Sequence, residues 1–257
     1  MQMERLKNGC RILVYDTCGS TMDLMHDLAR QGNAGPFDSV LAKIQTRGRG
    51  RMHKEWIAPE GNLNASMLFP EDLFRNSAFS ENLMPLLAGY AVTEVLSLKG
   101  VDARIKWPND IVFAEKKLGG ILVEKKKEGV ILGIGINIKT LPVFHDMENG
   151  FSLAPASLAG LLDPPPDPLA LWRKAAEFLF EFFEKTLAKE TPMVFNRKFI
   201  RKCVWVNETV EYSTPSSGVE TAFLKGVSPS GALILEQNNE EFEVFSGSIR
   251  KPGKRIR

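Results

Sequence analysis

The hydrophobic pattern changes near residue 200, and this change constrains the fold more than any other feature of the chain. Before it, segments with the two-residue alternation of strands are interleaved with segments whose apolar residues recur at helical spacing. After it, short strand-like runs follow one another with turn residues between them. The pattern predicts an α+β domain over residues 1–200, with a mixed sheet and packed helices, and a small β-barrel over residues 201–257.

The individual elements follow from apolar periodicity and from residues that begin or end helices. In the first domain, strands are expected at Arg11–Tyr15, Ser39–Ile44, Asn62–Phe69, Arg104–Trp107, Asp110–Phe113, Leu118–Lys125 and Val130–Ile138. Helices are expected from the N-cap pair Ser20-Thr21 to Gly32, from Pro85 to Gly100 and from Leu169 to about Lys189. In the second domain, strands are expected at Val204–Tyr212, Thr221–Val227, Ala232–Leu235 and Phe242–Phe245, followed by a basic, mobile tail.

Composition narrows the class of protein. With 44% hydrophobic and 25% charged residues in 257, the chain is an ordinary globular protein, which excludes disordered, collagen-like and disulfide-scaffold classes. A net charge of +2 does not favour a phosphate-backbone binder, so no specific DNA partner is expected. No apolar stretch approaches the roughly 20 residues of a membrane span, and the charged N-terminus is unlike a signal peptide. We therefore expect a cytoplasmic protein without a membrane partner.

A loop rich in glycine and arginine is the first candidate site. Gln45–Arg51 alternates two glycines with three arginines, and Thr46–Glu55 has no apolar period. Glycine lets backbone N–H groups approach an anion, and each guanidinium offers a fork of donors suited to carboxylate or phosphate. The motif alone is equally consistent with closure over an anionic ligand and with a flexible basic or RNA-contacting segment.

Two further segments favour an anionic ligand. Lys106–Asp110 joins two strands, and Lys117 begins an otherwise apolar strand with Gly119-Gly120, where a lysine needs an anionic partner. Gly133–Asn137 places small residues in an apolar strand. No Walker, complete Rossmann, HExxH or Gx-Ser-x-Gly motif is present, and the histidines and three cysteines are scattered, so no protein-ligated metal is expected.

Taken in this order, Ser20-Thr21, Gln45…Gly48-Arg49-Gly50-Arg51…Trp56, Lys106–Asp110, Lys117–Glu124 and Gly133–Asn137 closely resemble the biotin–protein ligases. The resemblance implies a class II synthetase-like catalytic domain followed by an SH3-like domain. It implies that the protein joins biotin to ATP, carried with Mg²⁺, and releases pyrophosphate. The biotinyl group of biotinyl-5′-AMP then passes to one lysine of a biotin carboxyl carrier domain in a biotin-dependent carboxylase.

The resemblance also implies roles for individual residues. Lys117 and Arg51 are the expected catalytic residues. The expected biotin-binding residues are Ser20, Thr21, Met22, Gln45, Gly48, Arg49, Gly50, Arg51 and Lys117. The expected ATP-binding residues are Arg49, Arg51, Trp56, Lys106, Asn109 and Asn137, with Trp56 a candidate for stacking on adenine. The sequence departs from the family's common pattern at Arg47, where a small residue is usual, at His53, where glycine is usual, and at Met22, where a polar residue is frequent.

Three other functions compete with this interpretation. A lipoate or octanoate ligase has a similar fold, but the Gly-Arg-Gly-Arg loop and Lys106–Asp110 favour biotin. A biotin-sensing module without catalysis is disfavoured by the presence of Asn109 and Lys117. A bifunctional ligase and repressor needs about 60 residues for a DNA-binding domain, and 19 residues precede Ser20. The oligomeric state, monomer or homodimer, stays open.

Overall fold

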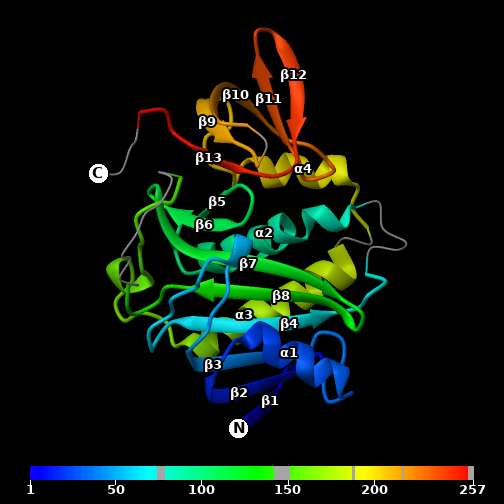
Figure 1. Cartoon of the computed structure of the whole chain (residues 1–257). Helices are drawn as coiled ribbons and strands as arrows, with labels where there is room; N and C mark the ends of the chain where they lie inside the picture. Colours follow the sequence, from blue (N-terminus) through cyan, green and yellow to red (C-terminus); the bar gives the residue numbers. More distant parts are fainter. Residues whose placement is uncertain (74–78, 142–150, 187–188, 216, 254–257) are drawn as a thin grey trace.

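The computed structural model describes residues 1–73, 79–141, 151–186, 189–215 and 217–253, and it contains two sheets (Figure 1). The larger sheet has eight strands in the order β1-β2-β3-β4-β8-β7-β6-β5. The strands are β1 (Gln2–Arg5), β2 (Arg11–Cys18), β3 (Ser39–Gln45), β4 (Leu63–Phe69), β5 (Arg104–Lys106), β6 (Asp110–Phe113), β7 (Lys116–Lys126) and β8 (Gly129–Ile136). The pair β2–β3 is parallel and the other neighbours are antiparallel, so the sheet is mixed as predicted.

Helices cover both faces of this sheet. The covering helices are α1 (Thr21–Arg30), α2 (Met84–Ser97) and α3 (Pro168–Glu181), whereas α4 (Pro192–Ile200) packs against the smaller sheet. The chain also has short turns η1 (Arg51–His53), η2 (Glu81–Leu83) and η3 (Leu158–Gly160) and a π-helical turn, η4 (Phe182–Thr186). Alternation along the strands separates two apolar clusters: Leu13 and Val40 pack under α1, whereas Ile12 and Leu41 face the larger core that contains α2 and α3. Strand β8 is buried along its whole length.

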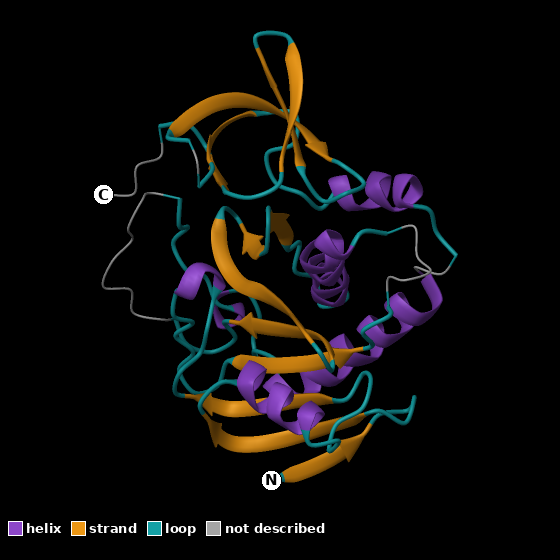
Figure 2. Ribbon diagram, turned by 45° about the vertical axis from the view of Figure 1, so that its right-hand side comes forward, coloured by secondary structure: helices purple, strands orange, loops and turns teal. Residues whose placement is uncertain are grey.

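The second sheet is antiparallel and follows α4 in the chain (Figure 2). Its strands are β9 (Thr209–Ser213), β10 (Val219–Val227), β11 (Leu233–Gln237), β12 (Glu240–Val244) and β13 (Ser248–Arg250), in the order β12-β11-β10-β9-β13. This arrangement confirms the predicted fold class. The segments around the two sheets are in contact: the indole N–H of Trp107, which follows β5, donates to the carbonyl of Gly231, which precedes β11, at 3.0 Å. Asn196 of α4 donates to the carbonyl of Val227 on β10 at 2.7 Å. The boundary at residues 200 and 201 stays a prediction.

Several local expectations were wrong. The strand expected over Val204–Tyr212 begins only at Thr209, because Trp205 and Asn207 have positive φ angles of 64° and 63° and turn the chain. The helix expected to run to about Lys189 ends as an α-helix at Glu181 and continues as a π-helical turn. Strand β1 and helix α4 were not predicted. The last four residues of the basic tail lie outside the described part of the chain.

The described residues include no helix that is both long enough and apolar enough to cross a membrane.

Candidate active site

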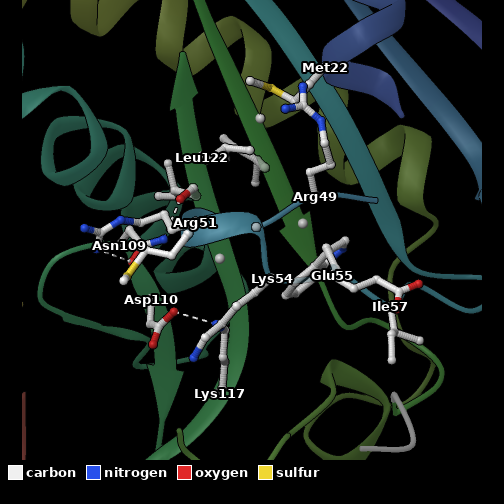
Figure 3. Close-up of a pocket in the computed structure, with 18 of the residues that line it drawn as sticks. Met22, Arg49, Arg51, Lys54, Glu55, Ile57, Asn109, Asp110, Lys117 and Leu122 are labelled. Atoms are coloured by element: carbon white, nitrogen blue, oxygen red, sulfur yellow. Dashed lines mark hydrogen bonds and ion pairs between the residues drawn. The ribbon is translucent and has the colours of Figure 1, made fainter. Parts of the chain in front are cut away.

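A cavity of about 220 Å³ lies where the loop after β3 crosses the ends of α1, β4, β7 and β8 (Figure 3). Phe151–Leu153 and the Gly247-Ser248 pair of the second sheet complete its wall. The structure brings most of the predicted site residues together around this cavity: Ser20, Thr21, Met22, Gln45, Arg49, Gly50, Arg51, Trp56, Lys106, Asn109 and Lys117. Segments more than 100 residues apart in sequence therefore form one site.

Two predicted site residues, Gly48 and Asn137, are not part of the cavity lining. A Cβ atom at Gly48 would lie 2.3 Å from the carbonyl oxygen of Trp56 and 2.4 Å from Nε2 of Gln45, so glycine is needed there for space. Asn137 is 2% exposed, and its Nδ2 donates to the backbone carbonyl oxygens of Ala156 at 3.1 Å and Lys117 at 3.4 Å. Both residues shape the site from behind its surface.

At one end of the cavity, the head end, the buried polar groups are neutral. The backbone N–H and the hydroxyl of Thr21 donate to Oε1 of Gln45 at 2.8 and 3.0 Å, and the hydroxyl of Ser66 donates to Oγ1 of Thr21 at 2.8 Å. Ser20 occupies the predicted N-cap position of α1, although its side chain makes no capping bond. Its hydroxyl and Nδ2 of Asn64 are buried without a partner among the described residues. Buried polar atoms of this kind are expected to pair with a ligand.

The opposite end, the cation end, gathers positive charge around one carboxylate. Arg51, Lys54, Lys106 and Lys117 line it with Asp110, whose Oδ1 lies 2.6 Å from Nζ of Lys117 and whose Oδ2 lies 3.7 Å from Nζ of Lys106. Burial alone would raise the pKa of Asp110, but the ammonium groups of Lys117 and Lys106 outweigh it and hold that pKa below its ordinary value. Four cations against one carboxylate leave this end positive.

Burial also acts on the cations themselves. The side chain of Lys106 is 4% exposed, and burial lowers its pKa against the opposing attraction of Asp110. Burial likewise lowers the pKa of Arg51, whose Nη1 lies 3.4 Å from Oδ1 of Asn109. Asn109 in turn donates from Nδ2 to the carbonyl of Ile121 at 2.7 Å, which fixes it against β7.

Trp56 lies between the two ends, on a floor of glycines. A Cβ atom at Gly135 would lie 2.3 Å from the indole, and one at Gly120 would lie 3.7 Å from it. The indole N–H donates to Oδ1 of Asn64 at 3.2 Å, and Nζ of Lys117 lies 5.8 Å from the ring centroid. Gly135 of β8 is therefore required for the close approach of the aromatic ring, whereas a Cβ atom at Gly120 of β7 would make an ordinary contact with it.

Sequence reasoning missed three residues of the site. Asp110 was noted in its motif but not assigned a role, although an aspartate between two lysines is a signal for an ion-pair cluster. Lys54 and Asn64 carried no signal of their own, because a loop lysine and a strand asparagine are common. The described residues contain no group of three or more histidine, cysteine, aspartate or glutamate side chains that could hold a metal ion.

Comparison with known proteins agrees with this geometry. Residues 15–140 match the model of the Biotin/lipoate A/B protein ligase family. The biotin protein ligase of Aquifex aeolicus, solved in complex with biotin and ATP, superposes with a TM-score of 0.78 at 26% identity and covers 93% of this chain and 97% of that one. The chain belongs to the biotin protein ligase family. Figure 3 shows residues that line the cavity in this chain.

Curated relatives match over different lengths. The bifunctional ligase/repressor BirA of Bacillus subtilis is 37% identical over 141 residues, which span 52% of this chain and 42% of that protein. The biotin–[acetyl-CoA-carboxylase] ligase of Paracoccus denitrificans is 29% identical over 207 residues, 76% of this chain and 82% of that protein. The chain described here therefore spans less than half the length of the B. subtilis relative.

Proposed function

We propose that the protein activates biotin with ATP to form biotinyl-5′-AMP and pyrophosphate, and then transfers biotin to a lysine of a carboxyl carrier domain. The observation that carries the proposal is a single cavity with two chemically different ends. The head end offers neutral hydrogen-bonding groups from Ser20 and Thr21, and the cation end offers Arg51 and Lys117. A ligand with a neutral polar head and an anionic tail fits this division.

The head end suits the ureido group of biotin. A cyclic urea has one acceptor and two donors, and the unpartnered Ser20 hydroxyl and Asn64 amide lie buried beside the Thr21–Gln45 pair. Pairing these atoms with the ligand removes the cost of leaving them unsatisfied. Met22 contributes its thioether to the wall, because Gly133 leaves space for it.

The cation end suits the reacting groups. The first step brings the carboxylate of biotin to the α-phosphate of ATP, and both carry negative charge. Lys117 holds its ammonium at this end through Asp110, at 2.6 Å, so the charge is already oriented before the ligands arrive. The new bond joins a carboxylate oxygen to the α-phosphorus, pyrophosphate leaves, and cationic side chains stabilise the charge that builds on the phosphoryl oxygens.

ATP enters as its Mg²⁺ complex, with the metal held by the phosphates. Lys106 and Asn109 line the cavity at the cation end and are proposed to contact the nucleotide. Trp56 offers a ring face for adenine. Asn137 lies behind the cavity surface, with an Oδ1 that is buried without a partner among the described residues, and its proposed part is to hold the backbone of Lys117. These four assignments, like that of Arg51, are proposals about this chain.

The second step needs a nucleophile from outside the protein. A neutral lysine amine of the carrier domain attacks the carbonyl carbon of the adenylate, AMP leaves, and an amide bond forms. A cysteine acyl-enzyme does not fit, since none of the three cysteines lines the cavity. Burial also raises the pKa of Cys18 to about 11, which keeps that thiol protonated near neutral pH.

Pyrophosphate release measured with ATP and either biotin, lipoate or octanoate tests the proposal. We expect release with biotin alone, and transfer of label to a biotin carboxyl carrier domain when that domain is added. Release with lipoate but not biotin would assign the protein to the other acyl ligases. Biotin binding without release would leave a sensing module.

A further inference from the structure

The side chain of Arg49 is held at the head end by two carboxylates. Its Nη2 lies 2.7 Å from Oδ1 of Asp23 on α1, and its Nη1 lies 2.7 Å from Oε1 of Glu124 on β7. Figure 3 shows Arg49 beside Met22, apart from Asn109, Asp110 and Lys117. This guanidinium therefore joins three segments: the loop after β3, the first turn of α1 and strand β7.

The loop that Arg49 anchors, residues 46–56, is folded back on itself and is called the flap below. Arg49 and Glu55 form an antiparallel bridge, the N–H of Gly50 donates to the carbonyl of Lys54 at 2.7 Å, and the N–H of Trp56 donates to that of Gly48 at 2.9 Å. The flap also carries Arg51 and Lys54, which line the cation end. Fixing Arg49 therefore restricts where those two cations stand.

We propose that Arg49 is a positioning residue: by bridging Asp23 and Glu124 it closes the flap over the head end and sets how long the cavity retains its ligand. The identity of that ligand, biotin or its adenylate, rests on the proposed function. The role assigned to Arg49 differs from the direct contact with ATP that the resemblance implies. It places Arg49 in ligand retention rather than in the chemical step.

The distances indicate that the ion pairs of Arg49 with Asp23 and Glu124 are what holds the flap in place. The contact with Glu124 is two-pronged, since Nη2 also lies 3.3 Å from Oε2, and such paired bonds fix orientation. At the other end of the flap, the contact from Arg51 to Asn109 measures 3.4 Å, close to the limit for a hydrogen bond. The side chains of Arg49 and Asp23 are 41% and 62% exposed, so water and salt reduce the strength of the tie.

The test compares Arg49→Gln with Glu124→Gln, Asp23→Asn and the double variant Arg49→Gln/Glu124→Gln. Arg47→Gln is the matched control, because Arg47 is an exposed arginine of the same loop that does not line the cavity. Preformed adenylate is chased with excess unlabelled biotin to measure release, and pyrophosphate release is measured in a single turnover. Hydrogen exchange of residues 46–56 is followed without ligand.

We expect Arg49→Gln and Glu124→Gln each to release adenylate about fivefold faster, with the double variant no faster than either, because both remove the same tie. In Glu124→Gln, whose side chain does not line the cavity, single-turnover pyrophosphate release should stay within about twofold of wild type. Wild-type release should accelerate with added KCl more steeply than release from Arg49→Gln. Flap exchange should quicken in Arg49→Gln and stay unchanged in Arg47→Gln.

The outcomes distinguish a direct contact by Arg49, a failure of its positioning role and a failure of the proposed function. Slow pyrophosphate release in Arg49→Gln with a neutral Glu124→Gln would mean that Arg49 contacts the reacting groups directly. Unchanged flap exchange in Arg49→Gln would remove the positioning role, whatever the ligand. If the wild type makes no adenylate while flap exchange still depends on Arg49, the proposed function fails and the flap tie stands.

Discussion

The two ends of the cavity differ in how their polar groups are satisfied. At the head end, hydrogen bonds link Thr21 to Gln45 and to Ser66. Neutral atoms such as the Ser20 hydroxyl remain without a hydrogen-bond partner among the described residues. At the cation end, Lys106 and Lys117 share the carboxylate of Asp110 and leave positive charge over. The head end therefore suits a neutral hydrogen-bonding group, which would pair its free atoms, and the cation end suits an anion, which would balance its charge.

The largest expected effect comes from removing the ammonium of Lys117. In Lys117→Ala, pyrophosphate release should fall by about 10²–10³-fold, because a preoriented charge no longer stabilises the phosphoryl transition state. Some stability should be lost as well, because Asp110 loses its partner at 2.6 Å and keeps only Lys106 at 3.7 Å, so thermal unfolding is measured to show that the variant is folded in the assay. Lys116→Ala is the control, because Lys116 is the exposed neighbour on the same strand. A folded Lys117→Ala with the wild-type rate would exclude the assigned role.

The next effect is on stability and tests whether Asp110 holds the cation end together. Asp110→Asn leaves the ammonium of Lys106 buried without its carboxylate, which should lower the free energy of unfolding by about 3 kcal/mol near neutral pH. Urea denaturation measures the change. Asp16→Asn is the control, because Asp16 forms its ion pair with Lys43 in an exposed position and should show a smaller effect.

The same variant makes a pH prediction. The folded-state pKa of Asp110 lies below its ordinary value, so its stabilisation is complete above about pH 4, the ordinary carboxyl range, and is lost as pH falls through the folded-state pKa. The stability difference between wild type and Asp110→Asn should therefore shrink on acidification. A difference that stays constant down to acid unfolding would show that the charge of Asp110 is not its contribution.

The third effect separates retention from synthesis at the cation end. Arg51→Gly removes a guanidinium from the cavity, so the adenylate should escape roughly tenfold more often while some synthesis continues. Escaped adenylate acylates lysines of any nearby protein. Mass spectrometry of an unrelated lysine-rich protein, incubated with enzyme, biotin and ATP, counts the modified lysines. Arg47→Gly should label no more than wild type, and equal labelling by Arg51→Gly would contradict a retaining role.

The two ends also differ in how far the sequence predicts them. The cation end could be predicted in part, because Lys117 begins an apolar strand, where a lysine needs an anionic partner. The sequence does not show that Lys106 and Lys117 share Asp110. Lys106 lies opposite Asp110 in the β5–β6 pairing, whereas Lys117 reaches it from β7, where the pairing with β6 shifts register between Ile111 and Val112. At the head end, Ser20 stands at the N-cap of α1 as predicted, but the sequence does not show that Thr21 bonds to Gln45.

The sequence predicts an element well where its apolar residues recur at a clear period. It does not predict an element that depends on a single cap or on one partner strand. Strands β4 and β8 and helix α2 lie near their expected bounds, because their apolar residues alternate or recur clearly. Helix α4 was missed although Thr191 precedes Pro192 and caps it, accepting from the N–H of Val194 at 3.4 Å. Strand β1 carries a mixed polar sequence, Gln2–Arg5, and exists because β2 supplies its partner.

The smallest expected effect has opposite signs for stability and for binding. Within the described part of the chain, the Ser20 hydroxyl is buried without a partner, so Ser20→Ala removes an unsatisfied group and should raise the free energy of unfolding slightly, by up to about 1 kcal/mol. The same change should weaken biotin binding about fivefold, because one hydrogen bond to the ligand is lost. Ser66→Ala is the matched control, since the Ser66 hydroxyl is bonded to Thr21 and its loss should lower stability. Calorimetric titration with biotin and urea denaturation of both variants measure the two quantities. If Ser20→Ala loses stability and keeps its affinity for biotin, Ser20 only begins the helix, and Thr21 and Asn64 alone are left as the proposed ligand contacts of the head end.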